Sequence, residues 1–465
     1  MKRKTSKVKK HPQRVVIDSD WEPVNAHAAG VDIGSREHWA CVPESAAARN
    51  VCQFGTFTAD LEAMAQWFKD CGVTTVAMEA TGVYWIPLFQ MLERHGFKVI
   101  LANARQTKNV AGRKSDVQDC QWIQRLHTYG LLQGSFRPED PYCVVRTYLR
   151  YRDELVAARS TQCQHMQKAL QQMNVQLSQV LSDVSGVSGL AIITAILEGE
   201  RDGAKLARLV DRRVRATPAA IEKALAGDYR DEHLFVLRQA YELYQTYEQK
   251  ITACDEQIVL ETAKLPTKVE LADQPLPARK PGRKPYLDKM AGQDMREALY
   301  QKFGVDLTAI EGIGVLTGLV LLTEVGPNVS RFRTEKHFCS WLGLCPDNRI
   351  SGGRVLSSRS RRVVNRASDA LRMAACTLER SQSALGGFYR RMKAKLGAAE
   401  AVTATAHKLA RLIYRLIKHG EAYVSQGLAL YEEKFKERKL RALHKMAKSM
   451  GFELTEKEPL PSGVS

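Results

Sequence analysis

Short apolar runs and amphipathic stretches alternate through the first 140 residues of the chain. Apolar or β-branched runs bounded by glycine or polar turns predict strands at residues 28–33, 38–42, 51–57, 74–78 and 98–102. Apolar residues at helical spacing predict a helix near Leu61 and helices at residues 83–95 and 116–129. Three successive strands followed by alternating helices and strands are typical of a mixed sheet flanked by helices.

After Pro141 the pattern becomes that of long helices. Seven-residue spacing joins Leu149, Val156, Cys163, Leu170 and Leu177, then Met166, Met173 and Val180, and finally Leu237, Tyr244, Ile251 and Ile258. Such heptads predict either a coiled coil between subunits or helices that pack within one monomer. We expect two helices that form an antiparallel hairpin, and we favour a homo-oligomer, either a dimer or a tetramer.

These patterns and a Pro/basic stretch at residues 276–285 divide the chain into six segments. We expect a basic disordered arm at 1–24, an α/β domain at 25–140, a helical coiled-coil segment with an insertion at 141–272, a basic Pro-rich linker at 273–300, a helical domain at 301–425 and a charged tail at 426–465. The element order of the first domain is that of the ribonuclease H-like fold. The predicted fold class is therefore α/β followed by all-α.

Charge favours a nucleic-acid partner over a membrane. The 465 residues include 69 Lys and Arg against 51 Asp and Glu, a formal charge of +18. The basic N-terminus lacks the apolar region of a signal peptide, and the longest apolar run, 313–325, is too short to span a bilayer. The ten cysteines include no Cys-x-x-Cys pair, so we expect buried thiols in a reducing cytoplasm.

Four carboxylates occupy places where they could converge on one edge of the predicted sheet. Asp32 lies on the first strand, Glu79 ends the fourth, and Asp116 and Asp119 lie three residues apart on one face of a helix start. A helix dipole alone favours acidic residues in a first turn, so each is also compatible with a solvated role. Together they suit Mg²⁺ or Mn²⁺, and two ions about 3.5–4 Å apart would stabilise the attacking and leaving oxygens of a phosphodiester.

The segments Gly30–Gly34, Met78–Trp85 and Lys114–Asp119 resemble the RuvC-like DEDD domain of transposases of the insertion sequence 110 family, including its 1111 group. The resemblance covers roughly the first 140 residues. It implies a divalent metal held by Asp32, Glu79, Asp116 and Asp119, a coiled-coil linker between two catalytic domains, and a structured guide RNA that chooses target and donor DNA. Such a protein would act on DNA in the bacterial cytoplasm, at the nucleoid.

The C-terminal half contains candidate phosphate-binding residues. Residues 307–316, with Gly312 and Gly314, have the pattern of a helix-hairpin-helix, whose N-terminal amides can hold a backbone phosphate. A short turn between any two helices uses such glycines too. Further candidates for nucleic-acid contact are Arg113, Lys114, Arg349, Arg354, Arg359, Arg361 and Arg362.

Ser351 precedes two glycines and lies among arginines that could neutralise a phosphate. Composition alone favours a glycine turn followed by the start of a basic helix. The same family resemblance extends to this stretch, and it implies that a serine in the motif is the nucleophile. Ser351 is the match, and Ser357, Ser358 and Ser360 remain alternatives.

The sequence therefore predicts a metal-dependent DNA transposase or recombinase that uses a serine nucleophile. One alternative is a RuvC-like junction nuclease that uses water and needs the four carboxylates but not Ser351. Another is a non-catalytic nucleic-acid-binding scaffold, whose affinity would fall steeply with salt and survive loss of all four carboxylates.

Overall fold

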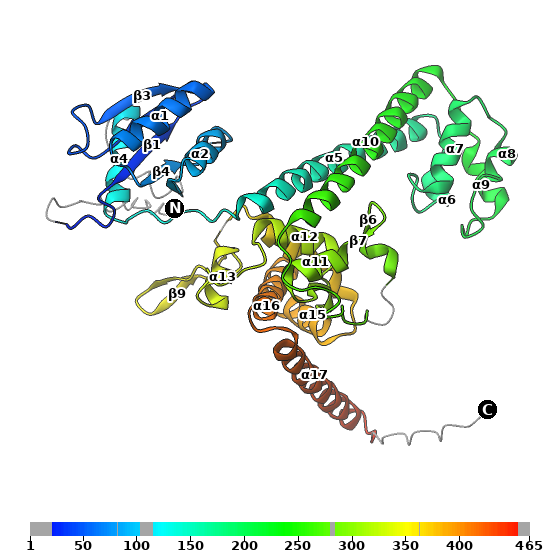
Figure 1. Ribbon diagram of the computed structural model, residues 1–465. Helices are drawn as coiled ribbons and strands as arrows, with labels where there is room; N and C mark the ends of the chain where they lie inside the picture. Colours follow the sequence, from blue (N-terminus) through cyan, green and yellow to red (C-terminus); the bar gives the residue numbers. More distant parts are fainter. Residues whose placement is uncertain (1–20, 81, 103–114, 280–283, 362, 454–465) are drawn as a thin grey trace, which may run out of the picture. The chain divides into compact units, whose positions relative to one another are not determined.

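The computed structural model describes residues 21–80, 82–102, 115–279, 284–361 and 363–453 (Figure 1). Arg113, Lys114, Arg362 and most of the predicted basic arm lie outside these ranges. The chain divides into two compact units, Met1–Arg137 and Pro138–Ser465. The finer division into six segments stays a prediction.

The first unit contains a five-stranded mixed sheet in the order β3-β2-β1-β4-β5. β1 pairs antiparallel with β2 and parallel with β4, which extends the sheet to β5. The strands are β1 (Ala28–Ile33), β2 (Glu37–Cys41), β3 (Val51–Gly55), β4 (Thr75–Glu79) and β5 (Lys98–Ala102). The predicted bounds differ from these by at most two residues. This sheet, followed by a helical second unit, confirms the predicted fold class.

Helices cover both faces of the sheet. Because side chains alternate along a strand, Val31 and Ile33 of β1 pack with α1 (Thr58–Asp70) and α2 (Trp85–Arg94) on one face. Ala77 of β4 belongs to a separate cluster with Ile123 and Leu126 of α4 (Asp116–Thr128), on the opposite face. The intervening β1 residues, including Asp32, therefore face α4.

The second unit begins with two long antiparallel helices, α5 (Asp140–Gln172) and α10 (Asp231–Lys264), which lie side by side in Figure 1. Arg152 pairs with Asp255, and Arg159, further along α5, pairs with Glu248, which comes earlier in α10. The predicted hairpin is thus observed within one chain. The buried seam residues include Leu149, Met166, Leu170, Leu237, Tyr244, Ile251 and Ile258. A coiled coil between subunits remains a prediction.

The insertion forms a small helical cluster at one end of this hairpin (Figure 1). Its helices are α6 (Leu177–Val180), α7 (Val187–Leu197), α8 (Gly203–Ala207) and α9 (Pro218–Leu225). Their apolar side chains share a core with Met166 and Leu170 of α5 and Leu237 of α10. Because α5 ends at Gln172, the last members of its predicted heptad series belong to this cluster rather than to the hairpin.

The helices between residues 295 and 419 form a separate core together with the start of α5. The Arg150 guanidinium makes a bidentate ion pair with Glu324 at 2.7 and 2.9 Å, which ties α5 to α12. The elements that follow α10 are η1 (Pro285–Asp288), β6 (Lys289–Met290), β7 (Gln293–Asp294), α11 (Met295–Phe303), η2 (Leu307–Ala309), α12 (Val315–Glu324), α13 (Glu335–Trp341), β8 (Arg349–Ser351), β9 (Arg354–Ser357), α14 (Arg366–Thr377), η3 (Leu378–Arg380), α15 (Ala384–Leu396), α16 (Ala398–His419) and α17 (Glu421–Ser449).

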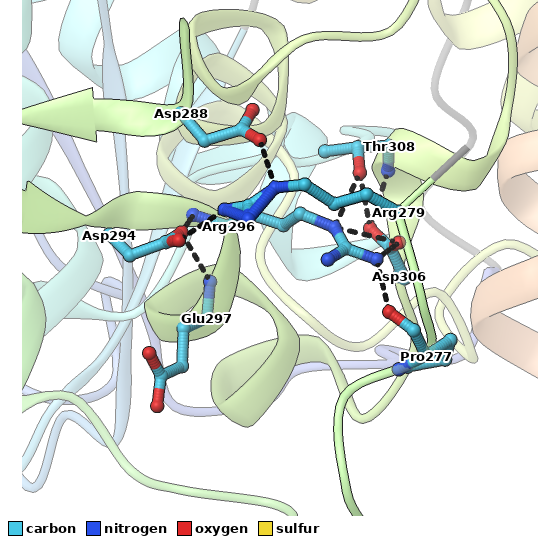
Figure 2. Close-up of polar contacts among 8 residues, drawn as sticks. All are labelled: Pro277, Arg279, Asp288, Asp294, Arg296, Glu297, Asp306 and Thr308. Carbon is cyan, nitrogen blue, oxygen red and sulfur yellow. Dashed lines mark hydrogen bonds and ion pairs between the residues drawn. The ribbon is translucent and has the colours of Figure 1, made fainter. Parts of the chain in front are cut away.

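A buried network of arginines and aspartates holds the segment that leads into α11 (Figure 2). The Arg296 guanidinium donates to the Asp306 carboxylate at 2.6 Å and to the Pro277 carbonyl at 2.7 Å. Arg279 donates to Asp288, whose side chain is fully buried, and also pairs with Asp294. Charged residues of the predicted linker are therefore used to anchor the chain beside α11.

None of the helices within the described ranges is both long enough and apolar enough to cross a membrane. All ten cysteines are free thiols.

Candidate active site

Asp32 and Glu79 emerge side by side on the α4 face of the sheet. The parallel register of β1 and β4 pairs Val31 with Met78, so Asp32 and Glu79 are the next residues on the two strands. Neighbouring strands lie about 5 Å apart, and the two side chains share a face because each follows a residue that points the other way. Two carboxylates thus lie on neighbouring strands, close to the carboxyl end of each strand.

Asp116 and Asp119 stand in the first turn of α4. Ser115 caps this helix, since its hydroxyl accepts a hydrogen bond from the Gln118 amide at 3.3 Å. The predicted helix start at residue 116 is confirmed. The helix α4 covers this face of the sheet, and its first turn therefore adds two carboxylates there.

The electrostatics of Asp32 link all four carboxylates. Burial, and then the charges of Asp119, Asp116 and Glu79 in that order of importance, together raise the pKa of Asp32 to about 6. Clustered carboxylates repel one another, and a bound cation relieves that repulsion. Their oxygens are the ligands that Mg²⁺ and Mn²⁺ prefer. The donor set therefore fits a hard divalent cation.

In the part of the chain that the structure describes, no three His, Cys, Asp or Glu side chains lie close enough together to hold a metal ion as one group. The four carboxylates interact through their charges, but they do not form a finished coordination shell. The structure thus brings the predicted residues into one region of the first unit without displaying a metal site.

Gly30 determines how closely α4 lies against β1. A Cβ atom at this position would lie 2.2 Å from the Gln124 backbone nitrogen and 2.6 Å from the Cys120 carbonyl oxygen. The Gln124 side chain also donates to the Ala28 carbonyl at 3.3 Å. Only glycine allows this backbone contact, which sets the distance between Asp32 and the first turn of α4.

The predicted helix-hairpin-helix residues form a turn between η2 and α12. Gly312 has a φ of +86°, which favours glycine, and a Cβ there would lie 3.0 Å from the Ala374 carbonyl oxygen of α14. Gly314 is the N-cap of α12, and a Cβ on it would meet nothing within 4 Å. The turn is packed against α14, and the start of α12 is open enough for a phosphate to approach.

Ser351 lies at the tip of a β-hairpin. The register pairs Ser351 directly with Arg354, and Gly352 and Gly353 between them have φ values of +55° and +76°. Positive φ at both central residues characterises the type I′ turn, which matches the twist of two-stranded ribbons. Because cross-strand partners project to the same face, the Arg354 side chain emerges beside the Ser351 hydroxyl.

The other candidate residues occupy different surroundings. Arg349 shares the exposed hairpin with Arg354. Arg361 donates to the Ser340 carbonyl at 3.0 Å, which anchors it to α13. Ser358, Arg359 and Ser360 line a cavity next to α15 and α16. Ser357 ends β9.

Sequence reasoning assigned no role to several residues around these groups. Gly30 is part of the Gly30–Gly34 motif. Its contact with α4 joins residues that are far apart in the sequence, so a local pattern does not reveal it. Phe388, Glu400 and His407 of the cavity come from two helices, and their spacing in the sequence carries no signal of their shared site.

Two family models match the chain. Residues 29–175 match the model DEDD_Tnp_IS110, described as a transposase. Residues 306–390 match the model described as the transposase IS116/IS110/IS902 family. The chain belongs to the IS110 family of transposases.

The first match covers all four carboxylates of this IS110-family transposase. The second covers Gly312, Gly314 and the hairpin with Ser351 and Arg354. A comparison with individually curated proteins finds no match. The family supports a transposase function in DNA transposition, and it implies that the chain binds DNA.

Proposed function

We propose that the chain cleaves and rejoins DNA strands at the ends of its insertion sequence, with Ser351 as the nucleophile and Asp32, Glu79, Asp116 and Asp119 as ligands of Mg²⁺ or Mn²⁺. The domain at 25–140 would supply the carboxylates, and the domain at 301–425 would supply the serine. The observation that carries the proposal is the electrostatic coupling of Asp32 to the other three carboxylates, in a region that matches a DEDD transposase family.

The carboxylates serve to hold the cation. Bound there, it would supply positive charge for the developing negative charge on the phosphodiester. The raised pKa of Asp32 supports this role, because three neighbouring acidic groups make the region favourable for a cation.

The serine step is a balanced displacement. The Ser351 oxygen forms a bond to phosphorus, the bond from phosphorus to the 3′ oxygen breaks, and a phosphoserine ester and a 3′ hydroxyl result. The serine proton leaves to a base and the 3′ oxygen gains a proton. Arg354, the cross-strand partner of Ser351, is placed to neutralise the phosphate under attack, and Arg349 adds charge on the same hairpin. Ser357, Ser358 and Ser360 remain the alternative nucleophiles.

Nucleic-acid binding accompanies the chemistry. The amides at the start of α12 would hold a backbone phosphate next to Gly312 and Gly314. The charge of +18 suits DNA and also the guide RNA implied by the family resemblance. We propose that the protein acts as a homo-oligomer on the nucleoid of a bacterial cell.

A cleavage assay with carboxylate variants tests the metal part of this proposal. The substrate is labelled DNA that spans the joined ends of the element, with the transcript that flanks the gene. Cleavage should require Mg²⁺ or Mn²⁺ and should disappear in Asp32→Asn, Glu79→Gln, Asp116→Asn and Asp119→Asn. Asp70→Asn, an exposed residue on α1 of the same unit, is the matched control and should cleave normally. Cleavage that persists in all four variants would overturn the assignment.

A further inference from the structure

A cavity of about 860 Å³ lies at the base of the Ser351 hairpin. One wall is the chain on either side of that hairpin, and the others are α15 and the first half of α16. Ligand sites that enclose small organic groups typically measure about 300–1,000 Å³. Apart from the alternative serines, the lining of this cavity contains no residue to which the sequence or the family resemblance gives a catalytic role.

The two segments that flank the hairpin also pair with each other at the cavity wall. Pro346 and Ser360 make an antiparallel bridge, and the Asp347 amide donates to the Arg359 carbonyl at 2.9 Å. Pro346 precedes Ser351 by five residues, so the cavity wall lies at most about 18 Å from the hairpin tip. At about 3.4 Å per nucleotide, a strand with its phosphate at Ser351 reaches the cavity within roughly five nucleotides.

The lining has the mixed character of a nucleotide site. Leu344, Phe388 and Leu396 supply apolar surface, of which Leu344 is only 3% exposed. Arg359 supplies a positive charge for a phosphate, and Glu400 and His407 supply hydrogen-bonding groups. Apolar faces combined with a few polar groups are what an unstacked base requires.

Positive charge surrounds the aromatic wall. The Lys408 ammonium lies 4.7 Å from the centroid of the Phe388 ring, and the Arg391 guanidinium lies 5.6 Å from it. These cations create an attractive potential for a polyanion near the Phe388 wall of the cavity. A neutral apolar ligand would gain nothing from them, whereas a nucleic-acid strand would.

We propose that this cavity holds one unstacked nucleotide of the DNA strand that is cleaved, with its base against Phe388 and Leu396 and its phosphate at Arg359. The inference rests on the proposed function, because it places the nucleotide on the strand whose phosphodiester lies at Ser351. Glu400 accepts hydrogen bonds only, so it would pair with a donor on the base edge, either an exocyclic amino group or a ring N–H.

A scan with 2-aminopurine tests the proposal, because this base fluoresces when it leaves the stack. The label is moved along the DNA on either side of the cleavage point, and Ser351→Ala is used to keep the DNA intact. One position within about five nucleotides of that point should brighten several-fold when the protein binds. Ala399→Met, which extends a side chain into the cavity, should abolish the increase. Ala398→Met, on the adjacent residue outside the lining, is the matched control and should retain it.

The outcomes separate this proposal from the proposed function. DNA that is bound and cleaved without brightening at any position overturns the nucleotide site and leaves the serine chemistry intact. An increase that is unchanged in Ala399→Met also overturns it. An increase only when the label is in the RNA transcript overturns the assignment to DNA. A normal increase with no cleavage by the unmodified protein supports the site and contradicts the proposed function.

Discussion

Gly30 of β1 and Gln124 of α4 are in backbone contact, so close that a Cβ on Gly30 would lie 2.2 Å from the Gln124 nitrogen. Gly30 lies two residues before Asp32 on the same face of the sheet, and α4 begins with Asp116 and Asp119. This contact therefore controls the spacing between Asp32 on β1 and the two carboxylates of α4. A residue without a side chain thus positions the candidate metal ligands.

Gly30→Ala should impair cleavage more than it impairs folding. The added methyl group forces α4 away from β1, at a cost of about 1–3 kcal/mol for overpacking. It also moves Asp116 and Asp119 relative to Asp32, so metal-dependent cleavage should fall strongly. Gly134→Ala is the control, because its Cβ would meet only the end of the Ile100 side chain, at 3.2 Å. Normal cleavage by Gly30→Ala would show that this spacing does not matter.

The stability of α4 should fall as the pH falls from about 6.5 to 4. His127 is 1% exposed and makes a 2.9 Å hydrogen bond to the Thr75 hydroxyl. Burial, and then the charge of Lys98, lowers the pKa of His127 from 6.5 to about 4. Below pH 6.5 the unfolded state therefore binds a proton that the folded state does not, and the folded state loses up to roughly 3 kcal/mol.

Hydrogen exchange of the α4 amides, corrected for the intrinsic rate at each pH, measures this loss. His127→Gln removes the titrating group, so its protection should vary much less between pH 6.5 and 4. The same pH dependence in the variant and in the unmodified protein would mean that other groups cause it.

The turn at Gly352 should control activity without controlling global stability. A β-branched residue at its φ of +55° is strained by about 1–2 kcal/mol, which is enough to distort an exposed two-stranded ribbon. Gly352→Val should therefore reduce strand cleavage about tenfold or more. Gly352→Asn should retain most activity, since asparagine tolerates this conformation. Equal activity of the two variants would contradict a role for the turn in placing Ser351.

The buried pair of Arg296 and Asp306 should be important for stability. Both side chains are only 4% exposed. Arg296→Met removes the cation that neutralises the buried Asp306 carboxylate, at a cost of about 3–5 kcal/mol. Arg441→Met is the control, because Arg441 and its partner Glu437 are 75% and 54% exposed, and such surface pairs contribute about 0–1 kcal/mol. Thermal unfolding of both variants measures the difference. Equal melting temperatures would contradict the account.

The sequence predicted best those elements whose residues meet a buried surface at regular spacing. The strand bounds of β1 and β5 are as expected, because each is an apolar run stopped by a polar or glycine residue. The heptads of α10 likewise identify its buried face. In both cases the local pattern is a direct consequence of burial.

Features that depend on distant contacts or on exposed backbone were harder to predict. The Ser351 stretch suggested a glycine turn followed by a basic helix, yet β9 follows the turn and α14 begins only at Arg366. Both strands of this hairpin are largely exposed, so they show no alternation of apolar and polar residues. Arg279 and Arg296 resembled residues of a solvated linker, because nothing local reveals their buried aspartate partners.

A covalent-adduct assay tests whether Ser351 is the nucleophile. The protein is incubated with labelled junction DNA, Mg²⁺ and the flanking transcript, then denatured, and label that travels with the protein is measured. We expect an adduct with the unmodified protein and none with Ser351→Ala. Cleaved DNA without an adduct, undiminished in Ser351→Ala but lost in Asp116→Asn, would contradict it and indicate hydrolysis by water. An adduct that survives Ser351→Ala would contradict the assignment of Ser351 and move the nucleophile to Ser357, Ser358 or Ser360.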